Sequence, residues 1–158
     1  MKQTVLVVAL VFTCAAATMA QSAAKSVFAE LGGPGLASVN FDTRFTKNQN
    51  GVGGRIGFGG FSLGGASLFL VPAAVNYLIG NNTSHYFELG AGATFSFASA
   101  DVGDGNNKVF NNTFGHLNLG YRYQPQNSGV TFRVAVNPLF GNGVFWPVYG
   151  GVSVGYKF

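Results

Sequence analysis

The sequence predicts an all-β protein, a closed, antiparallel, up-and-down transmembrane β-barrel of eight strands. Three observations predict this class. Apolar residues alternate with a period of two over successive segments of about ten residues. The residues between them are mostly small and polar, and only 9% of the 158 residues are charged, whereas 24 are glycine. The single cysteine, Cys14, excludes a scaffold held together by disulfides.

Residues 1–20 have the layout of a secretory signal peptide. Lys2 gives a positive start, an apolar stretch follows, and the segment ends in small residues. Cleavage is expected before Gln21, which leaves residues 21–158 as one barrel domain. The apolar stretch is shorter than the roughly 20 residues of a membrane-spanning helix. Two alternatives stay open, a buried N-terminal helix and a lipoprotein acylated at Cys14.

Four segments toward the C-terminus show the alternation most clearly. In each of them Val, Leu, Phe and Tyr occupy one face, while Gly, Ser, Thr, Asn and isolated charges occupy the other; the segments are 87–97, 116–124, 130–140 and 148–158. A soluble sandwich would expose many Lys and Glu on its polar face, whereas small residues fit the crowded interior of a narrow barrel. The apolar face is therefore predicted to meet lipid, where every backbone polar group needs a partner and the sheet must close.

Weaker alternation predicts four further strands upstream. Residues 68–79 are apolar on both faces, and residues 53–63 alternate with an expected bulge at Gly59-Gly60. Residues 27–45 keep one parity on both sides of a turn signal, Gly33-Pro34-Gly35. A hairpin at this turn and one long bent strand both fit the stretch. We predict the hairpin, because single-chain bacterial barrels have an even number of strands.

The connections between the predicted strands alternate between short and long. Segments 46–51, 80–84 and 125–129 are short and polar, as on the periplasmic side of an outer-membrane barrel, whereas 99–113 and 141–147 would face the cell surface. Aromatic residues gather near both ends of the strands, which is typical of girdles at the two membrane interfaces.

The chain resembles the small eight-stranded outer-membrane barrels of the OmpA/OmpX type. The resemblance covers roughly residues 26–158, and its main motif is the end of the last strand, Gly155-Tyr156-Lys157-Phe158. The chain is also similar to uncharacterised outer-membrane barrel proteins in segments 88–93, 120–124 and 137–140. This resemblance implies an outer-membrane location among outer-membrane lipids, with Tyr156 and Phe158 as an assembly signal for periplasmic chaperones and the barrel assembly machinery. A monomer without cofactor, metal or nucleic-acid partner is expected. The resemblance identifies no activity, because such barrels include enzymes, adhesins and structural proteins.

Nearly all charges of the predicted mature chain lie on the inward face of the strands. Counting from the short turns places Glu88 and Arg122 at similar depth on neighbouring strands, with Arg133 on the next strand, so these three should meet. The predicted network in the lumen comprises Asp42, Arg44, Arg55, Glu88, Arg122 and Arg133. A salt-bridge plug is favoured, because eight strands leave an interior mostly filled by side chains. The alternative is a narrow passive pore with an anion-selective constriction. With Glu30 and Lys157 included, five inward basic residues face three acidic ones.

His116 is the residue that suggests an enzyme. It lies on the inward face near a loop containing Ser99, Asp101 and Asp104, and some outer-membrane barrels modify lipid A with a His, a Ser and an acid. A lipid A deacylase pattern would need His-x-Ser, but this chain has Asn118 at the third position. A histidine that lines the lumen is therefore favoured, and the predicted role is structural or surface interaction without catalysis.

Overall fold

The computed structural model describes residues 23–63, 66–81, 84–101, 107–141 and 143–158. The predicted signal peptide and Asp104 lie outside the described residues. The strands are β1 (Lys25–Gly32), β2 (Ala37–Arg44), β3 (Gly51–Leu63), β4 (Ala66–Ile79), β5 (His85–Asp101), β6 (Asn107–Tyr123), β7 (Gly129–Val136), β8 (Leu139–Gly141), β9 (Val144–Trp146) and β10 (Gly150–Lys157), with a 3-10 turn, η1 (Gly33–Gly35).

Eight of these strands close into an antiparallel barrel. Strands β1 to β7 pair in chain order, β10 pairs with β7, and β10 returns to β1 with Val27 opposite Tyr156. The predicted fold class and strand number are confirmed. The predicted hairpin is confirmed too, because β1 and β2 pair along their length across the turn η1.

The outward and inward faces alternate along each strand. Large apolar side chains cover the outside, whereas the buried positions hold polar and charged residues. Among the described residues the buried hydrophobic side chains are Phe28, Leu70, Leu78 and Tyr86. This arrangement is the reverse of a soluble domain and matches a barrel with a lipid-facing surface. No helix within the described part of the chain is long and apolar enough to cross a membrane.

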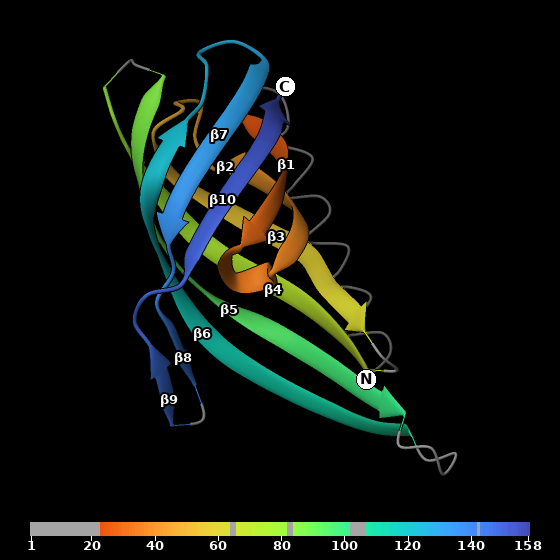
Figure 1. The fold of residues 1–158 in the computed structure, drawn as a ribbon. Helices are drawn as coiled ribbons and strands as arrows, with labels where there is room; N and C mark the ends of the chain where they lie inside the picture. Colours follow the sequence, from red (N-terminus) through yellow and green to blue (C-terminus); the bar gives the residue numbers. More distant parts are fainter. Residues whose placement is uncertain (1–22, 64–65, 82–83, 102–106, 142) are drawn as a thin grey trace, which may run out of the picture.

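The predicted strand 130–140 is divided in two. β7 ends at Val136 and β8 begins at Leu139, because Pro138 has no N–H for a sheet ladder. The Asn137 N–H donates instead to the Tyr149 carbonyl at 2.7 Å. β8 then pairs with β6 and β9, so that β8 and β9 form a short hairpin that is joined to the wall through β6 and projects beyond β7 and β10 (Figure 1).

The prediction of a bulge at Gly59-Gly60 is wrong. Gly59 lies opposite Leu70 and Gly60 opposite Phe69, in the same register that joins Gly51 to Leu78, so no extra residue is inserted. Gly60 has a φ of +140°, and a Cβ there would collide with the Leu68 carbonyl oxygen. The glycine is needed for close approach of two backbones rather than for a bulge.

The height of the barrel wall changes around its circumference. We call the end at which β1 begins and β10 ends the proximal end, and the opposite end the distal end. β1, β2, β7 and β10 have eight residues each, whereas β5 and β6 have 17 each. β5 and β6 therefore extend well past the tip of the β1–β2 hairpin at the distal end (Figure 1). Most of the predicted loop 99–113 is consequently strand, since Phe97 pairs with Asn111 and Asp101 with Asn107.

Candidate functional site: the charged interior

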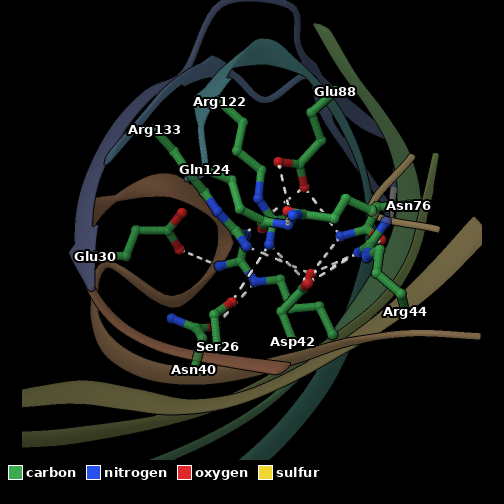
Figure 2. A network of polar contacts seen from close by, with 12 residues as sticks. Ser26, Glu30, Asn40, Asp42, Arg44, Asn76, Glu88, Arg122, Gln124 and Arg133 are labelled. Atoms are coloured by element: carbon green, nitrogen blue, oxygen red, sulfur yellow. Dashed lines mark hydrogen bonds and ion pairs between the residues drawn. The ribbon is translucent and has the colours of Figure 1, made fainter. Parts of the chain in front are cut away.

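Asp42 of β2 lies at the centre of the interior. Its carboxylate accepts hydrogen bonds from Arg44 Nη2 and Arg122 Nη2, each at 2.9 Å, and Arg133 Nη2 lies 3.5 Å from Oδ2. Asn76 Nδ2 donates to the same carboxylate at 2.6 Å. Asp42 is 1% exposed, and side chains from opposite sides of the barrel converge on it (Figure 2).

Glu88 of β5 joins the same cluster. Arg122 Nη1 lies 3.6 Å from Glu88 Oε2, and Arg133 Nη1 lies 3.7 Å from Oε1. Asn76 Nδ2 also donates to Glu88 at 3.0 Å, so this amide bridges the two carboxylates. The structure thus brings Glu88, Arg122 and Arg133 together. We call the five residues Asp42, Arg44, Glu88, Arg122 and Arg133 the central cluster.

Arg55, the sixth predicted network residue, contacts a different carboxylate. Its guanidinium pairs with Glu30 of β1, and its Nε donates to Asn40 Oδ1 at 3.0 Å. Arg55 lies opposite Asp42 in the β2–β3 register, but none of its recorded ion pairs or hydrogen bonds within the described structure involves Asp42. Glu30 and the two amides Asn40 and Asn76 are therefore members of the interior network that sequence reasoning did not assign.

Phe28 is a fourth interior residue that sequence reasoning did not assign. It points into the barrel from β1 and is 1% exposed. The Arg133 guanidinium carbon lies 3.8 Å from the ring centroid, and that of Arg55 lies 5.0 Å from it. An aromatic face attracts a cation placed over it, so the ring contacts both guanidinium groups and links the central cluster to the Arg55–Glu30 pair. The sequence did offer a sign of this position, because Phe28 stands two residues from both Ser26 and Glu30 and therefore shares their inward face.

The turn η1 covers the interior on the distal side. Gly33, Pro34 and Gly35 are all buried. Gly33 has a φ of +66°, and a Cβ there would lie 2.8 Å from the Glu30 carboxyl carbon. A Cβ at Gly35 would lie 3.3 Å from Pro72 Cγ of β4. The turn therefore lies close to Glu30 and also reaches β4, which is not adjacent to β1 or β2 in the barrel.

A set of amides covers the interior on the proximal side. Gln49 of the β2–β3 turn donates to Gln126 Oε1 of the β6–β7 turn at 3.2 Å and accepts from Gln124 Nε2 at 2.9 Å. Gln126 Nε2 donates to the Tyr86 hydroxyl at 3.1 Å. Because these two turns lie on opposite sides of an eight-stranded barrel, the bonds cross its mouth.

Lys157 supports the same proximal cover from β10. Its ammonium donates to the carbonyls of Pro125, Gln126 and Asn127 at 3.0, 2.7 and 3.3 Å. All three donors of the ammonium are therefore used to hold one turn. The neighbouring residues of the predicted assembly signal, Tyr156 and Phe158, are exposed instead, 52% and 59% respectively.

His116 is buried on the inward face of β6, and its Nδ1 lies 3.3 Å from the Thr94 hydroxyl. Ser99 and Asp101 lie farther along β5, opposite Val109 and Asn107, whereas His116 lies opposite Gly92. Within the described residues, the structure brings neither a serine nor an acid into recorded contact with His116. The described part of the chain also contains no cluster of three or more His, Cys, Asp or Glu side chains that could hold a metal ion.

No protein-family model and no curated protein sequence matches the chain. Solved structures do match. The N-terminal barrel domain of Pseudomonas aeruginosa OprF aligns with a TM-score of 0.63 at 12% identity, over 86% of this chain and 96% of that one. Neisserial surface protein A aligns with a TM-score of 0.53 at 15% identity, over 85% and 94%. Ail of Yersinia pestis, in a phospholipid nanodisc, aligns with a TM-score of 0.55 at 14% identity, over 86% and 98%. The chain therefore has the closed eight-stranded architecture of these small outer-membrane barrels.

Proposed function

We propose that this protein is an integral outer-membrane barrel with a closed lumen, which acts as a structural or surface-interaction protein rather than as a pore. The proximal end would lie in the periplasm and the distal end at the cell surface. The observation that carries the proposal is the central cluster, in which every side chain is at least nine-tenths buried and Asp42 binds arginines from three different strands.

Two further layers support a closed lumen. The turn η1 lies over Glu30 on the distal side, and the Gln49–Gln126 bonds cross the mouth on the proximal side. An ion crossing the barrel would therefore have to displace a buried turn, an ion-pair cluster and a hydrogen-bonded amide layer in succession. Eight-stranded barrels are just wide enough for side chains to fill them, which agrees with this arrangement.

The uneven wall supports the surface-interaction part of the proposal. A transmembrane β-strand needs about 9–11 residues, so much of each 17-residue strand β5 and β6 would stand outside the membrane. At its distal end β6 continues beyond the part that pairs with β7 and β8. Among the similar structures, one is named a surface protein and another an attachment invasion locus protein, which fits this role.

The lipid-modifying alternative has less support. A nucleophile and its base must lie within hydrogen-bond reach, and the recorded partner of His116 is a threonine. We therefore assign His116 to the interior polar surface and propose no catalysis.

Conductance across planar bilayers tests the proposal. The purified, refolded full mature chain should insert without unitary current steps under an applied potential. Reproducible ohmic steps from the unaltered protein would overturn the closed lumen and favour the narrow pore. The variant Asp42→Asn is the matched positive control, because it leaves three arginines facing one carboxylate in the central cluster and should open transient conducting states. Insertion of both proteins is verified by their boiled and unboiled migration in detergent gels.

A further inference from the structure

The wall formed by β6, β7 and β10 presents hydrogen-bond donors that the described protein groups leave unused. The atoms without a hydrogen-bond partner among the described residues include Arg122 Nε and Nη1, all three nitrogens of Arg133, Thr131 Oγ1 and Ser153 Oγ. All four residues are at most 5% exposed. They are neighbours in the sheet, because Arg133 lies opposite Arg122 on one side and opposite Ser153 on the other.

The charges of the central cluster do not balance. It contains three guanidinium groups and two carboxylates, and Glu30 is already paired with Arg55. Both terminal nitrogens of Arg44 have hydrogen-bond acceptors, because Arg44 also donates to the Gly51 carbonyl and to Asn76, and only its Nε lacks a partner among the described residues. Arg133 lacks such acceptors among the described residues, since its nearest carboxylate oxygens lie at 3.5 and 3.7 Å and its other neighbour is the Phe28 ring. The excess positive charge therefore resides mainly at Arg133.

A buried charge without a counter-charge is strongly unfavourable. Lysine or histidine could lose a proton in such a place, but arginine stays charged in proteins. Arg133 shares its two carboxylates with Arg122, so a bound negative ion would balance the charge that is left over. Guanidinium N–H groups and hydroxyl groups donate well to anions, and charge-assisted hydrogen bonds of this kind are the strong ones.

We propose that the interior binds one small inorganic monovalent anion of the halide type at Arg133, with Ser153 and Thr131 as additional donors. The central cluster has an excess of one positive charge, which sets the valence; Lys157 is not counted, because its ammonium is held by three carbonyls of the proximal turn. The small size follows from the narrow interior of an eight-stranded barrel, which side chains mostly fill. The ion would act as a structural counter-ion of the barrel. This inference does not depend on a closed lumen, because it is tested by thermal stability, whereas the closed lumen is tested by conductance.

Chloride dependence of unfolding tests the site. The refolded full mature chain is heated in detergent at constant ionic strength while chloride replaces gluconate, which is too large to enter the cluster. The midpoint of unfolding should rise with chloride concentration, as for any ligand that binds only the folded state. A midpoint that is the same at all chloride concentrations would overturn the proposal.

Two variants locate the effect. Arg133→Gln leaves two guanidinium groups facing two carboxylates, so the chloride dependence should vanish. Lys47→Gln removes a positive charge from an exposed turn and should leave the dependence unchanged. Equal chloride dependence in Arg133→Gln and the unaltered protein would show that the ion binds elsewhere and would overturn the assignment.

Variants that remove a hydroxyl donor test the same site even if Arg133→Gln does not fold. Thr131→Val and Ser153→Ala retain every charge but remove a donor, and each should raise the half-saturating chloride concentration several-fold. Crystals grown with bromide give a direct second readout by anomalous scattering. A bromide peak beside Arg133 supports the site, whereas bromide peaks only on the exposed surface would contradict it.

Discussion

Asp42 differs from the other interior acids in the number of arginines that lie within ion-pair distance of its carboxylate. Arg44, Arg122 and Arg133 all approach its carboxylate, whereas Glu30 has one ion-pair partner, Arg55. Removing one member of a buried ion pair leaves the partner charge uncompensated, which typically costs about 3–5 kcal/mol. The loss should therefore be larger where three partners are left than where one is left.

The variant Asp42→Asn should lower the free energy of unfolding more than Glu30→Gln does. Both changes are nearly isosteric and remove one negative charge, so they form a matched pair. Urea unfolding and refolding in detergent micelles measures the two losses. An Asp42→Asn loss equal to or smaller than that of Glu30→Gln would contradict the central position of Asp42.

Phe28→Leu should destabilise the barrel through its arginine contact as well as through lost packing. A cation over a desolvated ring contributes up to about 2 kcal/mol, and Arg133 stacks on the Phe28 ring. In an Arg133→Gln background, Phe28→Leu should therefore cost less than in the unaltered protein. Equal losses in the two backgrounds, measured in the same urea titration, would assign Phe28 a packing role alone.

At this scale the sequence predicts which residues point inward but not which of them touch. Alternation places Asp42, Glu88 and Arg122 inside, and the strand order brings Glu88 and Arg122 to neighbouring strands. The strand order does not predict that three arginines contact Asp42, because long side chains reach across a narrow barrel to strands that are not adjacent. Arg55 shows this most clearly, since it lies opposite Asp42 in register but pairs with Glu30.

At the scale of elements, the turn η1 depends on two glycines for different reasons. Gly33 needs a positive φ and has the Glu30 carboxylate beside it, whereas Gly35 has Ser38 and Pro72 nearby. Gly143 in the β8–β9 turn also has a positive φ, of +77°, but nothing lies within 4 Å of the place where its Cβ would be. Substitutions at Gly33 and Gly143 can therefore be compared. Both would strain the backbone, but only the one at Gly33 would also meet a closely packed neighbour.

Gly33→Ala should destabilise the barrel more than Gly143→Ala. A left-handed backbone costs an L-residue roughly 1–2 kcal/mol, and both variants incur this term. Only Gly33→Ala also pushes against the Glu30 carboxylate and disturbs its pair with Arg55. Urea midpoints of the two variants measure the difference, and equal losses would show that η1 does not pack tightly over Glu30.

The elements were predicted well where the two faces of a strand differ strongly and less well toward the distal end. The alternation in 87–97 and 148–158 is strong because one face is the apolar outside of the barrel and the other is its polar interior. Residues 107–114 of β6 lack that contrast, so a polar composition favoured a loop although the segment continues as strand. The division between β7 and β8 follows from Pro138, which sequence reasoning placed within one continuous strand.

At the scale of the whole molecule, the polar inside and apolar outside predict behaviour typical of integral barrels. The protein should fractionate with outer membranes. Unboiled samples should migrate differently from boiled ones in detergent gels, because a closed sheet has no free edge at which mild detergent can begin to unfold it. Recovery as a soluble periplasmic protein without a heat-dependent shift would contradict membrane insertion and favour a secreted sandwich.

The central claim is that the charges of the interior are paired with one another and not separately solvated. A double-mutant cycle on Asp42→Asn and Arg122→Gln tests it most directly, because their side chains are joined by a 2.9 Å contact between non-adjacent strands. Each single change should destabilise the barrel, and the double variant should recover part of the loss, which gives a coupling energy within the range of roughly 0.5–3 kcal/mol for residues in contact. Losses that simply add would contradict the account, since they would mean a wet lumen and would favour the narrow pore.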